Sequence, residues 1–172
     1  MLKDNMALQR RSRKFRIGLN PGFLAVLALF LTFQLAPLGA ATTERVVNDK
    51  NTGLAIFGYD PVAYFTDSKP VVGKPDYELS FGDVVWRFRS DGNRAAFSGS
   101  PEIYQPRYGG YDPISISRGI AVPGNPMLWA IVGERLYLFY DEAARTEFAA
   151  NPDSAISAAD GRWQEVLQGL SN

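Results

Sequence analysis

The sequence predicts a small α+β domain: a single domain with two antiparallel β-hairpins, capping helices and a C-terminal amphipathic helix. Two stretches alternate apolar and polar side chains on either side of a short turn, which is typical of hairpins. Residues that commonly cap helices precede three further segments. The last of these segments carries its apolar side chains on one stripe at helical spacing.

Both hairpins are expected from the alternation of their side chains. The first is expected over residues 77–89, where Gly82-Asp83 forms a favourable two-residue turn. Its alternating apolar residues are Tyr77, Leu79, Phe81, Val84, Trp86 and Phe88. The second is expected over residues 128–140, with its turn at 133–135. The residues expected on one face of its second strand are Leu136, Leu138 and Tyr140.

Three helices are expected to follow the strands. Ser90 caps the first, and Asp141 caps the second. Asn151-Pro152 opens the third, by the usual preference of these residue types for the first helical positions. Its apolar stripe consists of Ile156, Ala159, Trp163, Val166, Leu167 and Leu170. Gly161 is expected to weaken or bend this helix.

The N-terminal residues have the composition of a secretory signal sequence. Six basic residues and one acidic residue lie within residues 1–16, and residues 17–43 carry no charge. An apolar run over 23–35 is followed by small residues and a proline over 36–41. This order of regions predicts a signal sequence over residues 1–41, cleaved after Ala40 or Ala41.

An uncleaved signal anchor is the alternative, because residues 17–40 together are just long enough to span a membrane. Cleavage predicts a periplasmic or secreted product, and retention predicts an anchor in the inner membrane. The remaining residues, 42–172, show no linker, low-complexity tract or internal repeat that we detect in the sequence. They are therefore expected to form one domain.

The composition excludes several kinds of chemistry. The chain has no cysteine and no histidine, and Met127 is the only methionine beyond residue 6. Zinc, copper(I) and iron–sulfur sites need such ligands, and Ser-His-Asp or Cys-His catalysis needs the missing base. We therefore predict no soft-metal site and no cofactor, and we assign no catalytic residue. Any acid–base chemistry would have to come from a perturbed carboxylate, lysine or tyrosine.

The charge of the expected domain limits its partners. Residues 42–172 carry 17 acidic and 12 basic side chains, a net charge of −5. No basic face is expected that would follow phosphates, so nucleic acid is not an expected partner. A membrane is expected only through an uncleaved leader. The expected partner is an unknown small ligand or protein.

Two segments fit neither the helical nor the strand period, and both combine tyrosines, glycines and an Asp-Pro step. They are 58–65, with the sequence GYDPVAYF, and 104–113, with the sequence YQPRYGGYDP. Proline restricts the residue before it, and glycine permits positive φ, so both segments are expected to be irregular. Irregular aromatic segments often carry function.

These segments also carry a family resemblance. GYDPVAYF at 58–65, WRF at 86–88, YQPRYGGY at 104–111 and LYLFY at 136–140 closely resemble the YHS-domain family, in particular its short exported bacterial branch. DGRW at 160–163 resembles the C-terminal helix of that branch. The resemblance extends from about Leu54 to Trp163 and implies a small α+β domain.

The resemblance implies less about function. A metal-binding role has been inferred for cysteine-bearing members of the family, and in the exported branch a cysteine typically follows the YGGY run. Here Asp112 stands at that position. One carboxylate can bind only a hard ion and is not a site by itself, so the metal role is not carried over.

The candidate ligand-binding residues lie in the two irregular segments: Tyr59, Asp60, Tyr64, Arg107, Tyr108, Tyr111 and Asp112. The tyrosines could form a stacking surface, or they could be core residues whose hydroxyls hold the segments in place. The two aspartates could converge as a carboxylate pair, or each could bond the amides of its own turn. The arginine could hold an anion or play a structural role.

Three functions remain open at this stage. The leading hypothesis is an exported, non-catalytic YHS-like module that binds a small ligand or a partner protein through the tyrosine-rich loops. The second is a hard-metal or anion site at Asp60, Asp112 and Arg107. The third is a hydrolase that depends on perturbed carboxylates.

Overall fold

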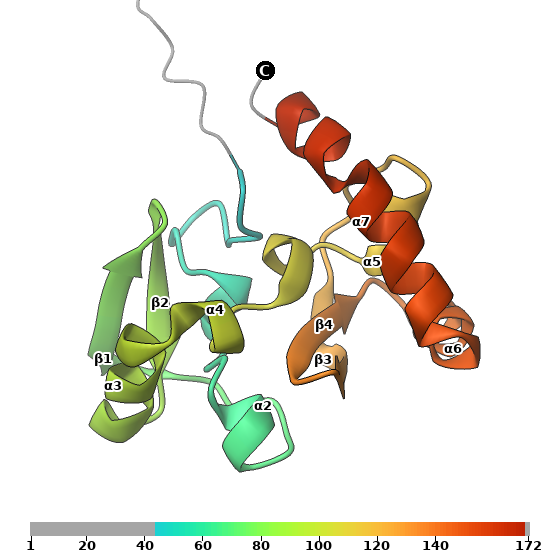
Figure 1. Ribbon diagram of the computed structural model, residues 1–172. Helices are drawn as coiled ribbons and strands as arrows, with labels where there is room; N and C mark the ends of the chain where they lie inside the picture. Colours follow the sequence, from blue (N-terminus) through green and yellow to red (C-terminus); the bar gives the residue numbers. More distant parts are fainter. Residues whose placement is uncertain (1–43, 171–172) are drawn as a thin grey trace, which may run out of the picture. The chain divides into compact units, whose positions relative to one another are not determined.

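The computed structural model describes residues 44–170. The predicted signal sequence, its cleavage site and the alternative anchor over 17–40 all lie outside the described residues. Among residues 44–170, no helix is long and apolar enough to cross a membrane. The same residues fold into two hairpins flanked by helices (Figure 1), so the predicted α+β class is confirmed.

Each hairpin is a separate two-stranded antiparallel sheet. The first pairs β1 (Lys74–Phe81) with β2 (Val84–Phe88), and the second pairs β3 (Asn125–Val132) with β4 (Arg135–Phe139). Both hairpins begin three residues before their expected starts at 77 and 128. Tyr140 was expected on the core face, but it lies beyond the end of β4 and is 58% exposed.

Six α-helices lie within the described residues: α2 (Ala63–Thr66), α3 (Asp91–Gly99), α4 (Pro101–Tyr104), α5 (Pro113–Ser117), α6 (Glu142–Ala150) and α7 (Pro152–Gly169). The three expected caps are confirmed, because the side chains of Ser90, Asp141 and Asn151 accept hydrogen bonds from backbone amides three residues further on. Helix α7 runs through Gly161 without interruption.

The described residues contain the same order of elements twice, and we call the two copies structural repeats, although no internal repeat was detected in the sequence. The first repeat, residues 56–104, runs from the short turn η1 (Ile56–Gly58) through α2, β1, β2 and α3 to α4. The second repeat, residues 107–169, runs from η2 (Arg107–Gly110) through α5, β3, β4 and α6 to α7. Both hairpins shift register between their first and second recorded strand pairs. The tetrapeptide GYDP occurs in both repeats, at 58–61 and 110–113.

Each repeat opens with three consecutive residues in the left-handed backbone region. The φ angles are 42°, 57° and 78° at Ile56, Phe57 and Gly58, and 53°, 62° and 90° at Tyr108, Gly109 and Gly110. The carbonyl of the last glycine accepts an equivalent hydrogen bond in each repeat, at 2.9 Å from the amide of Gly73 or Gly124. Left-handed backbone is costly for residues with a Cβ. The same left-handed turn therefore occurs at equivalent positions in both repeats.

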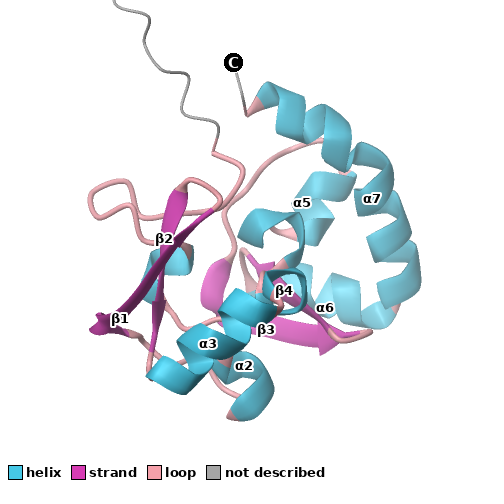
Figure 2. Ribbon diagram, turned by 60° about the vertical axis from the view of Figure 1, so that its left-hand side comes forward, coloured by secondary structure: helices cyan, strands magenta, loops and turns pink. Residues whose placement is uncertain are grey.

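The core consists of two clusters that share β4. Leu136 and Leu138 lie in the cluster with Trp86, Phe88 and Phe97 of the first repeat. The alternate side chains of β4, Tyr137 and Phe139, lie in the cluster formed by α5, α6 and α7. Figure 2 shows these three helices on one side of the β3–β4 hairpin and the β1–β2 hairpin on the other. Strand β4 therefore supplies buried side chains to both repeats.

Candidate functional site

The buried carboxylate of Asp60 joins three elements of the first repeat. Its Oδ1 accepts hydrogen bonds from the amides of Val62 at 2.8 Å and Ala63 at 3.3 Å, at the start of α2. Its Oδ2 accepts from the amide of Arg89 at 2.8 Å, beyond the end of β2, and from Nδ2 of Asn93 at 2.7 Å in α3. Asp60 is 0% exposed, so these bonds replace its contacts with water.

Asp112 has the same arrangement in the second repeat. Its Oδ1 accepts from the amides of Ile114 at 2.7 Å and Ser115 at 3.2 Å, at the start of α5. Its Oδ2 accepts from the amide of Tyr140 at 3.0 Å, beyond the end of β4. Asp112 is 1% exposed.

The capping interpretation of both aspartates is therefore confirmed. Each carboxylate satisfies amides of its own repeat, and the recorded partners of Asp60 and Asp112 have no residue in common. Within the part of the chain that the structure describes, no group of three or more acidic side chains is placed to hold a metal ion. The geometry thus favours neither the metal site nor the carboxylate hydrolase.

Two predicted tyrosines connect the first repeat to the second hairpin. The hydroxyl of Tyr64 donates to the carbonyl of Pro126 at 2.9 Å, and its ring meets Trp129 edge-on at 5.3 Å. Burial raises the pKa of the Tyr64 hydroxyl well above its usual value. The hydroxyl of Tyr59 lies 3.6 Å from Sδ of Met127. Tyr64 is therefore a core residue whose hydroxyl holds its segment in place, and it does not form part of a stacking surface.

Tyr111 is also buried and holds the segment that precedes the first repeat. Its hydroxyl donates to the carbonyl of Glu44 at 3.0 Å. Burial, with a smaller effect of the nearby Glu44 carboxylate, raises the pKa of Tyr111 to about 12. Its ring lies 6.4 Å from that of Trp163.

Arg107 and Tyr108 meet at one carboxylate of α7. The guanidinium of Arg107 donates to Oδ1 of Asp160 at 2.7 Å, and the hydroxyl of Tyr108 donates to the same oxygen at 2.9 Å. The guanidinium carbon also lies 5.3 Å from the centre of the Tyr108 ring. Burial opposes the charge of Arg107, but its attraction to Asp160 outweighs this and raises the pKa of the guanidinium. This cluster fastens η2 to the C-terminal helix.

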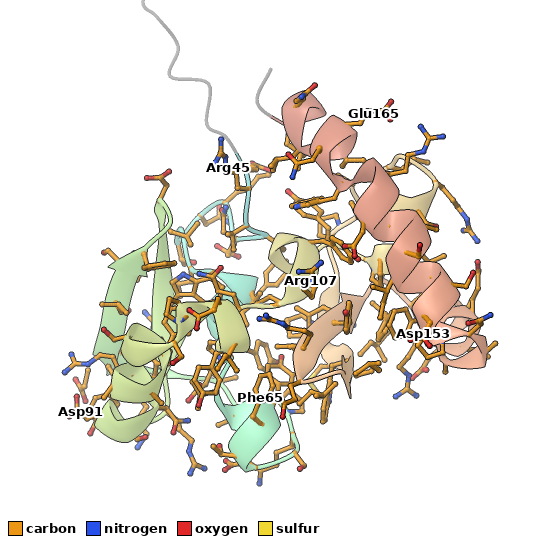
Figure 3. The ribbon with its side chains drawn as sticks, in the orientation of Figure 1. Arg45, Phe65, Asp91, Arg107, Asp153 and Glu165 are labelled. Carbon is orange, nitrogen blue, oxygen red and sulfur yellow. The ribbon has the colours of Figure 1, made fainter. Side chains whose placement is uncertain are left out.

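A groove of about 490 Å³ opens beside this cluster. Its lining includes side chains from η2, from α7, from the β1–β2 turn and from the segment before the first repeat, among them Arg45, Phe81, Arg107, Tyr108, Arg135 and Trp163. Figure 3 shows Arg45 and Arg107 between the β1–β2 hairpin and α7. Hollows of this size accommodate small organic ligands.

Of the seven predicted residues, only Arg107 and Tyr108 line this groove. A second hollow of about 430 Å³, between β3 and α6, is lined by none of the seven. Sequence reasoning missed Arg45, Arg135, Asp160 and Trp163 as neighbours of the η2 segment. The last two belong to the DGRW motif at 160–163 and lie one helical turn apart, so a shared helix face could have been expected for them. Their contacts with Tyr108 depend on the tertiary fold and leave no signal in the sequence.

Comparison of the chain with protein-family models, curated proteins and solved structures found no match. The fold and the groove define a small α+β domain with an arginine-lined hollow at the junction of its repeats.

Proposed function

We propose that this chain is an exported, non-catalytic binding module of the YHS type, which holds a small ligand in the groove beside Arg107 and Tyr108. The observation that carries the proposal is the position of the YQPRYGGY segment. This segment is part of the family resemblance, and five of its consecutive residues, Gln105 to Gly109, line the groove. Export is inferred only from the predicted signal sequence over residues 1–41.

The chemistry of the candidate residues supports binding rather than catalysis. Both buried aspartates already accept hydrogen bonds on each of their carboxylate oxygens. Burial raises the pKa of the Tyr108 hydroxyl, and the hydrogen bond to the charged Asp160 raises it further. This tyrosine therefore keeps its proton at neutral pH. A general base near neutral pH needs a group that exchanges its proton there.

The walls of the groove suit a small ligand. The aromatic residues Phe81 and Trp163 lie in the same lining as three arginines and the side chain of Gln105. Apolar surface with a few convergent polar groups is the usual composition of a small-molecule site. The left-handed turn at Tyr108–Gly110 and its bonds to α7 hold this wall in place before a ligand arrives.

The test is native mass spectrometry of the chain purified from an exporting host, compared with a variant whose groove is filled. We expect the wild-type chain to carry the extra mass of an organic molecule and Gln105→Trp to lose it, because the larger side chain occupies the groove. Thr146→Trp, which fills the other hollow, is the matched control and should retain the ligand. The denatured mass of the same sample shows whether residues 1–40 or 1–41 have been removed.

Two outcomes would contradict the proposal. Retention of the ligand by Gln105→Trp with loss in Thr146→Trp would place the ligand in the hollow between β3 and α6. A wild-type chain that carries no extra mass, even after incubation with a small-molecule extract of its host, would make it a module for a protein partner instead.

A further inference from the structure

The arginines of the described residues divide into two groups by their partners. Nine arginines lie within residues 44–170, and seven of them form ion pairs with carboxylates. Within the same residues, Arg45 and Arg135 are the two that have no carboxylate within ion-pair distance. Acidic side chains outnumber basic ones in this part of the chain, so a shortage of carboxylates does not explain the difference.

Both arginines line the groove that also contains Arg107. Arg135 is half-buried at the start of β4, and its Nη1 donates to the backbone carbonyl of Glu102. This bond orients the guanidinium and leaves its charge uncompensated. A half-buried guanidinium without a carboxylate is a favourable partner for an anion, because little water must be displaced to reach it.

The backbone of Arg45 is held against η2. A Cβ at Gly109 would lie 2.0 Å from the carbonyl oxygen of Arg45, so the two backbones are in close contact. The amide of Val47, two residues further on, donates to the carbonyl of Gly109 at 2.8 Å. The segment that carries Arg45 is therefore fixed to η2, and its side chain extends from a defined place.

We propose that the groove binds an organic oxyanion, a carboxylate or phosphate on an apolar or aromatic body, through the guanidinium groups of Arg45 and Arg135. The inference rests on the proposed function and names the class of its ligand. Guanidinium groups bind carboxylates and phosphates with paired, charge-assisted hydrogen bonds. Trp163 and Phe81, which is 43% exposed, supply apolar surface for the rest of the molecule.

The acidic residues of the groove leave this positive charge in place. Asp160 compensates Arg107. Asp83 and Glu102 also line the groove, but both are exposed, and neither forms an ion pair within the described residues. Water screens exposed carboxylates, whereas the half-buried Arg135 is screened less. Arg135 therefore remains available to a bound anion. Arg45 is exposed and forms no ion pair within the described residues, so its guanidinium is also accessible.

The test is a titration of the full-length, ¹⁵N-labelled chain from an exporting host. Binding is monitored through the NMR signals of the arginine Nε groups and the tryptophan indoles. The probes are phenyl phosphate, benzoate, benzyl alcohol and inorganic phosphate. We expect phenyl phosphate, benzoate or both to shift the signals of Arg45, Arg135 and Trp163 in a saturable way. Tighter binding of phenyl phosphate would identify a phosphate ligand, and tighter binding of benzoate a carboxylate. Benzyl alcohol and inorganic phosphate should each bind at least about tenfold more weakly than the better anion, since each lacks one half of the recognised chemistry.

Charge-removing variants test the two arginines directly. Arg45→Gln and Arg135→Gln should each raise the Kd of the better anion about tenfold, which corresponds to about 1.4 kcal/mol. Arg118→Gln is the matched control, because Arg118 pairs with Glu147 and does not line the groove, and it should leave the Kd unchanged. Equal affinities in the wild-type chain and in both groove variants would overturn the inference.

The remaining outcomes separate this inference from the proposed function. If benzyl alcohol shifts Trp163 as strongly as the anions do, the groove binds small molecules without regard to charge, and only the anion inference fails. Only the anion inference fails, too, if no probe shifts these signals but the wild-type chain retains a ligand that Gln105→Trp loses. If no probe binds and no ligand is retained, both proposals fail.

Discussion

The carboxylates of Asp60 and Asp112 occupy equivalent positions in two repeats of one chain. Each joins the start of a short helix to the backbone just beyond the second strand of a hairpin. Each follows a tyrosine with extended backbone, which comes directly after the last glycine of a left-handed turn. The Asp-Pro steps that drew attention to a carboxylate pair are therefore two copies of one structural joint.

Removing this joint should destabilise the fold. Asp60→Ala leaves the amides of Val62 and Arg89 and the side chain of Asn93 without their acceptor in a buried site. We expect a loss of at least about 3 kcal/mol in the free energy of unfolding, measured by urea denaturation. Asp153→Ala, at an exposed position in the first turn of α7, should cost less than about 1 kcal/mol. Equal losses in the two variants would contradict the assigned role.

Gly109 should be the least replaceable glycine of the second repeat's turn. Gly109→Ala combines a φ of 62° with a Cβ that would lie 2.0 Å from the carbonyl oxygen of Arg45. Gly82→Ala has a nearly equal φ of 63° but open space around the new Cβ, so it isolates the backbone cost of about 1 kcal/mol. We expect the Tm of Gly109→Ala to fall well below that of Gly82→Ala. Similar values would show that the contact with Arg45 relaxes freely.

Stability should decline in alkaline solution because of the buried tyrosines. The pKa of Tyr111 is raised from about 10 in the unfolded chain to about 12, so the folded state holds its proton more tightly. The stabilisation is complete below about pH 10 and is lost as the pH rises towards about 12. Tyr111→Phe should weaken this decline in unfolding free energy measured between those pH values. An unchanged pH profile would assign the decline to other groups.

The ion pair between Arg107 and Asp160 should contribute little to stability. Both side chains are more than one third exposed, so water and salt screen their attraction. A double-mutant cycle of Arg107→Gln and Asp160→Asn should give a coupling energy below about 1 kcal/mol, similar to that of Arg118 and Glu147. A coupling several times larger than that of the control pair would show that the cluster at η2 is more rigid than its exposure suggests.

Features that depend on neighbouring residues could be predicted from the sequence. The hairpins follow from alternation, and the helix starts follow from Ser90, Asp141 and Asn151, because strand faces and N-caps are decided within a few positions. The repeat was missed because its two copies share little beyond Gly-Tyr-Asp-Pro. Phe57 in one copy stands where Gly109 stands in the other, and both adopt the same left-handed backbone.

The groove could not be predicted because its members come together only in the folded chain. Arg45 precedes both repeats, Arg135 begins β4, and Trp163 lies in α7. Their separation in sequence leaves no local pattern. The candidates Asp60 and Asp112 were found from local signals, and their helix caps are local. Their second bonds, to the amides of Arg89 and Tyr140, are long-range contacts that the sequence does not indicate.

The alternating side chains of β4 make the two repeats interdependent. Leu136 and Leu138 complete the interior of the first repeat, although they belong to the second. A chain that ended after α4 would lack these two residues, and its remaining apolar side chains would face water. The two repeats should therefore unfold in one cooperative transition, in spite of their matching architecture, and neither half is suited to independent existence.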